Sequence, residues 1–314
     1  MSHLSSSGPS PTNPDSESPH GALFLVLHYL PLRELLAFQS VSRIFCDAIS
    51  SDPSLWREIT VQPPLSSKLS DEALLGISSR AEGTLRSLTL IDCVKISDDG
   101  LLTVVEQNPE ITKLFVPGCL HLTADGMVEV VKRLHDRKGN VDQLRLRLYG
   151  LCNIKKDHLD VLNSFLCKDG SRSKSLMPSF YGSNHSSGSI NNDDGRPIDV
   201  DMCPICRSVR LVFDCTRDKC RKMEQRWIEC RGCFFCIARC EDCGGCIDPD
   251  HVCHSESACK HLLCIDCWLQ LPKCDTCNRP YCKGHNSFVG PTTGFICQEC
   301  ADGDFLRNVP EAGF

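Results

Sequence analysis

The sequence predicts a multidomain protein in three parts: a small all-α domain, a short α/β repeat segment and a loop-rich module stabilised by zinc. Three observations indicate this division. An apolar stretch follows a Ser- and Pro-rich N-terminus, and two later segments align with each other at a period of 26 residues. In addition, 19 of the 24 cysteines lie between Cys203 and Cys300. A chain of 314 residues has room for two or three modest domains.

Composition limits the cellular compartments and the classes of binding partner expected for this protein. A net charge of −6 provides no general attraction to nucleic acid or to anionic lipid. The first residues lack the basic start and apolar run of a secretory signal. The most apolar stretch, residues 22–32, is too short to span a bilayer. We therefore expect a cytoplasmic or nuclear protein, in which clustered cysteines bind metal rather than form disulfides.

Shifts in composition predict the boundaries between the parts. Ser-, Pro-, Gly- and Asn-rich stretches cannot bury enough apolar surface to offset the entropy lost on ordering. We expect a disordered leader at 1–18, a helical domain at 19–62, a repeat segment at 65–167, a flexible linker at 168–200, a cysteine-rich module at 201–300 and a tail at 301–314.

The helical domain contains more apolar residues than it can bury. Residues 23–30 predict a helix that is apolar nearly all round, and such a helix must be covered on more than one side. Pro31 suits the first turn of a second helix, and Asp52 followed by Pro53 predicts the start of a last turn. A domain of roughly 40 residues is marginal alone. The excess apolar surface therefore indicates that another polypeptide covers it.

This pattern resembles the F-box. The matching elements are Pro19, Tyr29-Leu30, Pro31 to Leu36, Val41 to Arg43 and Asp52 to Trp56, whereas Ser18 and Gly21 stand where the family usually has Leu and Glu. The resemblance implies docking on the Skp adaptor subunit, and through it on a cullin-based ubiquitin ligase, the SCF complex. The adaptor-binding residues that it implies are Pro19, Leu30, Pro31, Leu35, Leu36, Val41, Phe45, Leu55 and Trp56. The alternative is a helical bundle that packs on its own downstream domain, and the two arrangements are compatible.

The repeat segment contains two units that align without a gap. Residues 85–105 and 111–131 each predict a strand, a turn and a helix, with Ser97 or Thr123 as the helix N-cap. Part of an earlier unit lies at 69–79 and a later unit at 144–162. These units resemble the cysteine-containing leucine-rich repeats found behind many F-boxes. Cys93 and Cys119 have no metal-spaced partner, so we expect both to be small buried hydrophobic residues.

The cysteine-rich module has the spacing of structural zinc sites. Eight Cys-x-x-Cys steps occur between Cys203 and Cys300, and Cys282-x-x-His285 adds a ninth pair. Two such ligands on a tight turn can reach one tetrahedral zinc at ~2.3 Å. About five zinc ions would satisfy the predicted ligands. These ligands are Cys203, Cys206, Cys215, Cys220, Cys230, Cys233, Cys236, Cys240, Cys243, Cys246, Cys259, His261, Cys264, Cys267, Cys274, Cys277, Cys282, His285, Cys297 and Cys300.

The order of these ligands suggests how they group. The eight from Cys203 to Cys240 are enough for two zincs, and the four from Cys282 to Cys300 suit another. Residues 243–277 lie between them with the spacing of a RING finger, in which alternate ligand pairs share a metal. A RING-type ubiquitin ligase acting through 243–277 is therefore one alternative function. Gly244 and Gly245 occupy the loop where a RING needs an apolar residue.

A zinc-dependent nucleic-acid-binding regulator is the other alternative. A basic run at 217–231 lies near the predicted ligands, as it would in a DNA-binding module. Residues 201–300 nevertheless contain 13 basic and 13 acidic side chains, which leaves no excess charge to neutralise phosphates.

The order of the parts resembles plant F-box proteins that have a short leucine-rich segment and a cysteine-rich C-terminus. This resemblance implies a non-catalytic substrate receptor of an SCF-type ubiquitin ligase. No residue of the chain is then expected to be catalytic, and the identity of the protein substrate is left open.

Overall fold

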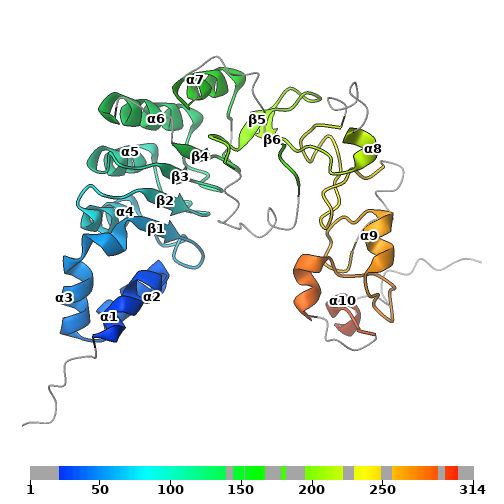
Figure 1. The fold of residues 1–314 in the computed structure, drawn as a ribbon, viewed down its shortest axis with the longest axis horizontal. Helices are drawn as coiled ribbons and strands as arrows, with labels where there is room; N and C mark the ends of the chain where they lie inside the picture. The colour runs from blue at the N-terminus through cyan, green and yellow to red at the C-terminus, as the bar shows by residue number, and fades with distance from the viewer. Residues whose placement is uncertain are drawn as a thin grey trace, which may run out of the picture.

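The computed structural model describes residues 21–138, 144–151, 153–166, 178–181, 195–221, 230–248, 257–288 and 294–302 (Figure 1). The helices are α1 (Ala22–Val26), α2 (Leu32–Gln39), α3 (Arg43–Ser51), α4 (Asp71–Ser78), α5 (Asp98–Gln107), α6 (Ala124–Lys138), α7 (Lys156–Leu166), α8 (Asp218–Arg221), α9 (Ile265–Gln270) and α10 (Gln298–Ala301). Shorter 3-10 turns are η1 (Leu27–Tyr29), η2 (Pro53–Trp56), η3 (Ser79–Ala81) and η5 (Lys283–Phe288). The strands are β1 (Glu58–Val61), β2 (Ser87–Leu90), β3 (Lys113–Phe115), β4 (Arg145–Arg147), β5 (Val200–Met202) and β6 (Val209–Leu211). Over the part of the chain described here, no helix is both long enough and apolar enough to cross a bilayer.

The N-terminal helices α1, α2 and α3 pack around aromatic side chains. The Phe45 ring lies 5.6 Å from that of Phe24 and 5.5 Å from that of Phe38, measured between ring centroids. Asp52 caps η2 by accepting a hydrogen bond from the Ser54 backbone N–H at 2.9 Å, with Pro53 in the first turn. The predicted Asp-Pro start of the last turn is therefore confirmed.

The helical domain does not end as a helix. Residues 58–61 form β1, which pairs in parallel with β2 and begins a four-stranded sheet in the order β1-β2-β3-β4. The prediction that 19–62 is helical is wrong here, because these residues supply the strand of the first repeat unit, whose helix is α4. Ile49 and Trp56 belong to the same buried cluster as Leu88 and Leu114. The N-terminal helices and the repeats thus share one hydrophobic core.

The repeat period appears directly in the sheet register. Leu88 pairs with Leu114, and Leu114 pairs with Leu146, while α4, α5, α6 and α7 cover one face of the sheet (Figure 1). Cys93 and Cys119 are fully buried, and the Cys119 thiol donates a hydrogen bond to the Leu90 carbonyl at 3.3 Å. The prediction that both cysteines are small buried residues is confirmed.

Acidic side chains connect successive repeat units. The Asp71 carboxylate accepts from the Ser97 N–H and hydroxyl, at 3.0 and 2.6 Å. One unit later, the Asp98 carboxylate accepts from the Thr123 N–H and hydroxyl, at 2.9 and 2.6 Å. A Cβ atom on Gly126 would collide with the Asp98 carboxylate, which explains the glycine at this helical position. Each acid therefore fixes the N-cap residue of the following helix, in addition to lying near the positive end of its own helix.

Replacing Asp98 with Ala is expected to destabilise the repeat segment by about 1–2 kcal/mol, because it removes both hydrogen bonds to Thr123. Asp99→Ala is the matched control, since Asp99 is an exposed acid in the same helical turn. Urea unfolding of the full chain, followed by circular dichroism, measures both changes. Equal losses of stability for the two variants would show that the bridge between units contributes nothing.

Two described parts of the predicted flexible linker are structured. Ile198 forms an isolated parallel bridge with Leu146, so the chain runs beside β4 at the edge of the repeat sheet before it enters β5. The Asp199 carboxylate accepts from the backbone N–H groups of Leu148 and Tyr149, at 2.8 and 3.1 Å. Residues 178–181 bridge to Asp214 in the cysteine-rich module. The linker prediction is wrong for these residues, while the predicted leader and tail (from 303 onward) lie outside the described residues.

Candidate docking face and metal centres

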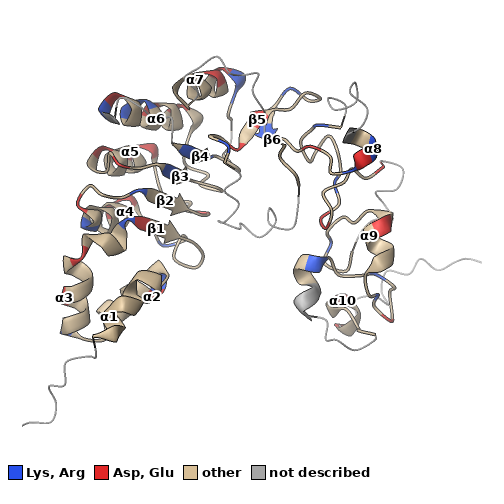
Figure 2. Cartoon of the chain, in the orientation of Figure 1, with Lys and Arg blue, Asp and Glu red and all other residues tan. Residues whose placement is uncertain are grey.

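Exposed apolar side chains gather on the N-terminal helices. None of the residues of α1 is buried, and Figure 2 shows no charged residue on this helix. Leu25 is 71% exposed, Tyr29 86% and Val41 69%. We call the following residues the N-terminal apolar surface: Leu23, Leu25, Val26, Tyr29, Val41 and Ile44. Such a surface can be covered by an apolar face of another protein.

The structure divides the predicted adaptor-binding residues into three groups. Leu35, Phe45 and Trp56 are buried in the core of the chain itself, so they are unavailable to a partner and their assignment is corrected. Leu30, Leu36 and Leu55 are partly buried against the same core. Pro31 and Val41 are exposed, and Pro19 lies outside the described residues.

Trp56 illustrates why the core residues cannot serve as contacts. Its ring is fully buried, its indole N–H donates to the Ile49 carbonyl at 3.0 Å, and the Arg80 guanidinium lies 4.7 Å from the ring centroid. Sequence reasoning missed Leu25 and Tyr29 as surface residues because a helix that is apolar all round does not reveal which side faces inward. The sequence signal that indicates an exposed apolar surface is the excess of apolar residues in the helical domain.

The cysteine-rich module brings all twenty predicted ligands into five groups of four, and within each group the ligand atoms lie within 4.8 Å of one another. Cluster 1 is Cys203, Cys206, Cys233 and Cys236; cluster 2 is Cys215, Cys220, Cys230 and Cys246; cluster 3 is Cys240, Cys243, Cys264 and Cys267; cluster 4 is Cys259, His261, Cys282 and His285; cluster 5 is Cys274, Cys277, Cys297 and Cys300.

The grouping differs from the predicted one. Cys246 joins cluster 2, whereas Cys240 belongs to cluster 3, so the eight ligands from Cys203 to Cys240 do not form a closed pair of sites. Residues 243–277 likewise do not form a RING unit, because their ligands are shared among clusters 2, 3, 4 and 5. The four ligands from Cys282 to Cys300 do not share one site either, because Cys282 and His285 belong to cluster 4 whereas Cys297 and Cys300 belong to cluster 5. Spacing identified which ligands are adjacent along the chain, but it did not identify which pairs meet.

Ligand pairs do alternate between two sites, as in a RING finger, but the series begins with the pair Cys240/Cys243 instead of Cys243/Cys246. Cluster 3 takes its pairs at 240/243 and 264/267, and cluster 4 takes its pairs at 259/261 and 282/285. The pairs of the two clusters alternate along the chain, so the segment between the two pairs of cluster 3 contains the first pair of cluster 4. Neither site is therefore formed by one continuous stretch of sequence. Cluster 5 contributes Cys274 and Cys277 from within the same stretch.

The ligand pairs share a local backbone geometry. In three of them the residue directly after the second ligand has positive φ: Arg207 at 60°, Gly244 at 70° and Asn278 at 56°. In the Cys259/His261 pair, the residue between the two ligands, Lys260, has a φ of 64°. Backbone N–H groups point at ligand sulfurs, as from Cys233 to Cys203 at 3.4 Å and from Cys297 to Cys274 at 3.2 Å. Such turns hold two sulfurs on one side and stabilise their negative charge.

The acidity of the thiols fits a bound cation. A hydrogen bond from the Cys246 thiol holds the pKa of Cys215 at about 4, and the same interaction raises the pKa of Cys246. In cluster 1, a backbone hydrogen bond from Ser208 lowers the pKa of Cys206 to about 6, while burial raises that of Cys236 to about 12. Four thiolates so close together cannot all ionise unless a cation neutralises them, as zinc does.

Arg239 gives a second test of this fit. Its guanidinium is fully buried and donates to the carbonyls of Phe213 and Cys230, at 2.8 and 2.6 Å. Its Nε and the other terminal nitrogen have no hydrogen-bond partner, and no carboxylate of the described residues pairs with it. A buried cation requires nearby negative charge. A zinc bound by four thiolates carries a net charge of −2, and Arg239 lies next to the ligand Cys240 and bridges to the ligand Cys246.

Several side chains of the basic run at 217–231, which could have bound nucleic acid, contact other residues inside the module. Arg231 pairs with Asp214 at 2.7 Å and with Asp201 at 2.9 Å. The Arg217 side chain packs against Gly245, and neighbouring thiols raise its pKa although burial opposes them. Lys222 and Arg226 lie outside the described residues. These arginines stabilise the module and do not form an open track for phosphates.

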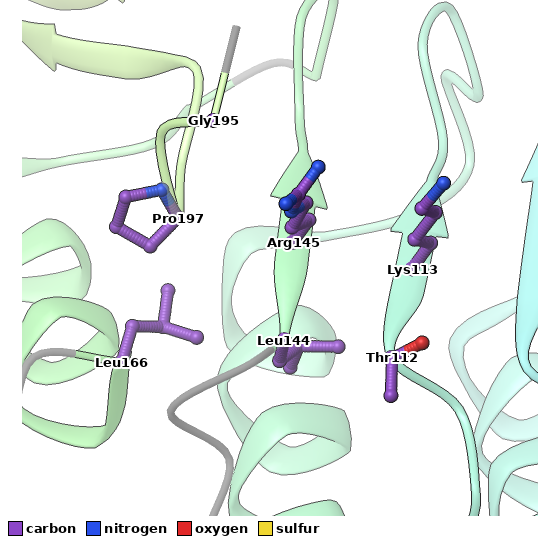
Figure 3. A pocket seen from close by; sticks show the side chains of 7 residues that line it. All are labelled: Thr112, Lys113, Leu144, Arg145, Leu166, Gly195 and Pro197. Atoms are coloured by element: carbon purple, nitrogen blue, oxygen red, sulfur yellow. The ribbon is translucent and has the colours of Figure 1, made fainter. Parts of the chain in front are cut away.

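A basic cavity lies at the edge of the repeat sheet. Its volume is about 610 Å³, and Lys113 and Arg145 project into it from neighbouring strands (Figure 3). Both cations already have partners within the chain. We therefore do not assign a ligand to this cavity.

Comparison with known proteins gives the class of this molecule. Residues 19–62 match the F-box-like family, and residues 199–276 match the family described as the At3g27290 F-box protein C-terminal domain. The second match begins at Asp199, where the chain leaves the repeat sheet for the cysteine-rich module. An F-box at the N-terminus and a cysteine-rich C-terminal domain thus occur in one chain.

Three proteins of Arabidopsis thaliana are similar along most of this sequence. F-box protein SKIP28 is 37% identical over 273 residues, which are 86% of this chain and 83% of that protein. F-box protein SKIP14 is 35% identical over 255 residues, covering 81% of this chain and 55% of that protein. F-box protein At3g27290 is 34% identical over 253 residues, covering 79% of this chain and 65% of that protein. The chain belongs to the family of plant F-box proteins with a cysteine-rich C-terminus.

Proposed function

We propose that the protein is the substrate-recognition subunit of an SCF-type cullin ubiquitin ligase, and that it docks on the Skp adaptor through its F-box. The observation that carries this proposal is the N-terminal apolar surface, which lies within the region matched by the F-box-like family. A partner that covers Leu25, Tyr29 and Val41 would remove from water the most exposed apolar side chains of the helical domain.

The remaining parts of the chain take supporting roles in this proposal. The parallel strand–helix units are leucine-rich repeats that hold the cysteine-rich module at a set distance from the F-box. The five clusters bind five structural zinc ions, which make the module rigid enough to present a recognition surface. The protein acts in the cytoplasm or the nucleus.

Catalysis in such a complex is a matter of proximity. The receptor holds a lysine of its target near a conjugating enzyme that carries ubiquitin, which raises the effective concentration of the two reactants. In this proposal no side chain of the receptor performs chemistry, and the chain is a non-catalytic adaptor.

Substituting Leu25, Tyr29 and Val41 together with Ala is expected to abolish co-purification of the Skp adaptor and cullin. The reason is that the substitutions remove exposed contact area without entering the core. Affinity capture of the tagged full chain from plant cells, followed by immunoblotting, measures the loss. Leu120→Ala is the control, because Leu120 is 57% exposed but lies outside the F-box region. Undiminished recovery of both partners with the triple variant would refute the proposed docking.

A RING-type ligase is a second candidate, and the interleaving of clusters 3 and 4 favours it. Helix α9 exposes Ile265 and Leu269 beside cluster 3, as a platform for a conjugating enzyme would. Glu241 and Asp242, however, fill the first metal loop where a RING needs an apolar residue. Ubiquitin chains built by the purified protein with a conjugating enzyme, in the absence of cullin, would establish this activity.

A further inference from the structure

A groove separates the last repeat unit from the cysteine-rich module. Its volume is about 990 Å³. One wall is the turn that follows β4, from Leu148 to Lys156, and the other combines the β5–β6 hairpin with the turn between the cluster 1 ligands Cys233 and Cys236. Both walls contribute apolar side chains, such as Leu151 from the first and Val209 from the second. None of the functions proposed for the F-box uses this groove.

Aromatic rings line one side of the groove in a continuous row. The Tyr181 ring stacks on that of Phe234, with centroids 5.4 Å apart and planes inclined at 25°. Phe234 meets Phe235 edge to face at 6.4 Å. Phe235 is 80% exposed although it is a large apolar residue. Phe234 and Phe235 are the two residues between Cys233 and Cys236, so a metal in cluster 1 would hold both rings in place.

The charged side chains of the groove are all positive. Lys155, Lys156, Arg207 and Arg210 line it, and no Asp or Glu does. None of the four has an ion-pair partner among the described residues, and the Arg210 guanidinium stacks over the Phe235 ring at 4.4 Å. If cluster 1 holds zinc, its net charge of −2 only partly offsets four cations. The groove therefore favours a ligand that is negatively charged and also has an apolar group to bury.

We propose that this groove binds a peptide segment in which an aromatic or large aliphatic side chain is flanked by acidic residues. The apolar side chain lies against Phe234, Phe235 and the apolar residues of the walls, and the flanking carboxylates pair with the lysines and arginines that line the groove. A role of the groove in recognising targets for ubiquitination rests on the proposed receptor function. Peptide binding by the groove does not depend on that function. A nucleic acid is less suited, because the cations surround one concave apolar site and do not follow a track of phosphates.

Binding of a fluorescein-labelled peptide, in which one Trp is flanked on each side by Glu residues, tests the proposal. Fluorescence anisotropy with the purified, zinc-loaded full chain is expected to show saturable binding that weakens as salt is added. Phe235→Ala, and separately Lys155→Glu combined with Lys156→Glu, should each weaken binding about tenfold or more. Peptides with Lys in place of Glu, or with Ala in place of Trp, should bind much more weakly.

Matched variants separate groove binding from general effects. Lys95→Glu makes the same type of charge change at an exposed residue of the repeat segment, and Leu120→Ala removes exposed apolar surface there. Both should bind the peptide as the unmodified chain does. Zinc content and thermal unfolding of the Phe235→Ala and Lys155→Glu/Lys156→Glu variants should also be unchanged, which shows that the module is intact.

Two results would overturn the proposal. The first is failure of the acidic Trp peptide to bind, or binding that the groove variants do not weaken. The second is tighter binding of a uridine oligonucleotide of similar net charge that the same groove variants abolish, because the groove would then be a nucleic-acid site. Capture of the Skp adaptor by the groove variants reports separately on the receptor function, so either idea can fail without the other.

Discussion

Removing zinc from the purified chain is expected to unfold the cysteine-rich module while the repeat segment keeps its helices. Each structural zinc site of this type contributes on the order of 10–16 kcal/mol to folding at neutral pH. Apolar residues are too few to replace it, since the buried clusters of the module consist largely of the cysteines themselves. Metal analysis should give about five zinc ions per chain, one for each cluster. Hydrogen exchange after chelation should increase in residues 200–302 more than in α4 to α6.

Single substitutions make this expectation specific. Cys264→Ala should reduce the zinc content by about one ion per chain, because Cys264 belongs to cluster 3 alone. Cys46→Ala is the matched control, since Cys46 is an exposed cysteine of the F-box region that belongs to none of the five clusters. Fewer than three zinc ions in the unmodified chain, or equal zinc contents in the two variants, would contradict the assignment of these clusters.

Trp56→Ala is expected to destabilise the N-terminal half of the chain by about 3–5 kcal/mol. The substitution leaves a large cavity in the core that α3, η2 and β1 share with the repeats, and it leaves the Ile49 carbonyl without its indole donor. Tyr29→Ala is expected to change stability by less than about 0.5 kcal/mol, because Tyr29 is 86% exposed. Urea unfolding of the two variants measures the contrast.

The same pair of variants separates a core role from a contact role. Tyr29→Ala should weaken adaptor binding in a protein that remains folded, whereas Trp56→Ala should lose binding only as far as it loses structure. If Trp56→Ala were as stable as the unmodified chain and still failed to bind the adaptor, Trp56 would contact the partner directly. The burial of its ring in the free chain would then change on binding.

Local signals predicted the repeat segment well. The alignment of Leu88 with Leu114 corresponds to the observed strand register, and Ser97 caps α5 as expected. The prediction misses the strand β1, because β1 lies within residues 19–62, which resemble an F-box and are predicted to be helical throughout. The bridge from Asp98 to Thr123 was also missed, because a carboxylate in the first turn of a helix already has a local explanation.

Prediction of the candidate sites from the sequence is limited in a similar way. The types and spacing of the ligands predicted which residues would gather, since a Cys-x-x-Cys turn is a local structure. Which two turns meet depends on the path of the chain, and for this reason the predicted groupings of Cys240, of Cys246 and of the four ligands from Cys282 to Cys300 are wrong. Similarly, the apolar content of the F-box predicted that a surface would be exposed, but it did not distinguish Tyr29 outside from Phe45 inside.

The parallel bridge between Leu146 and Ile198 constrains how this protein can be divided. The chain passes beside β4 before it enters the cysteine-rich module, and Asp199 is anchored to the backbone of the preceding unit. A chimaera joined before residue 195 would pair Ile198 and Asp199 of one relative with the β4 unit of another. Exchanges of modules between relatives should therefore be joined after residue 199, so that the bridge to Leu146 and the hydrogen bonds of Asp199 stay within one parent sequence.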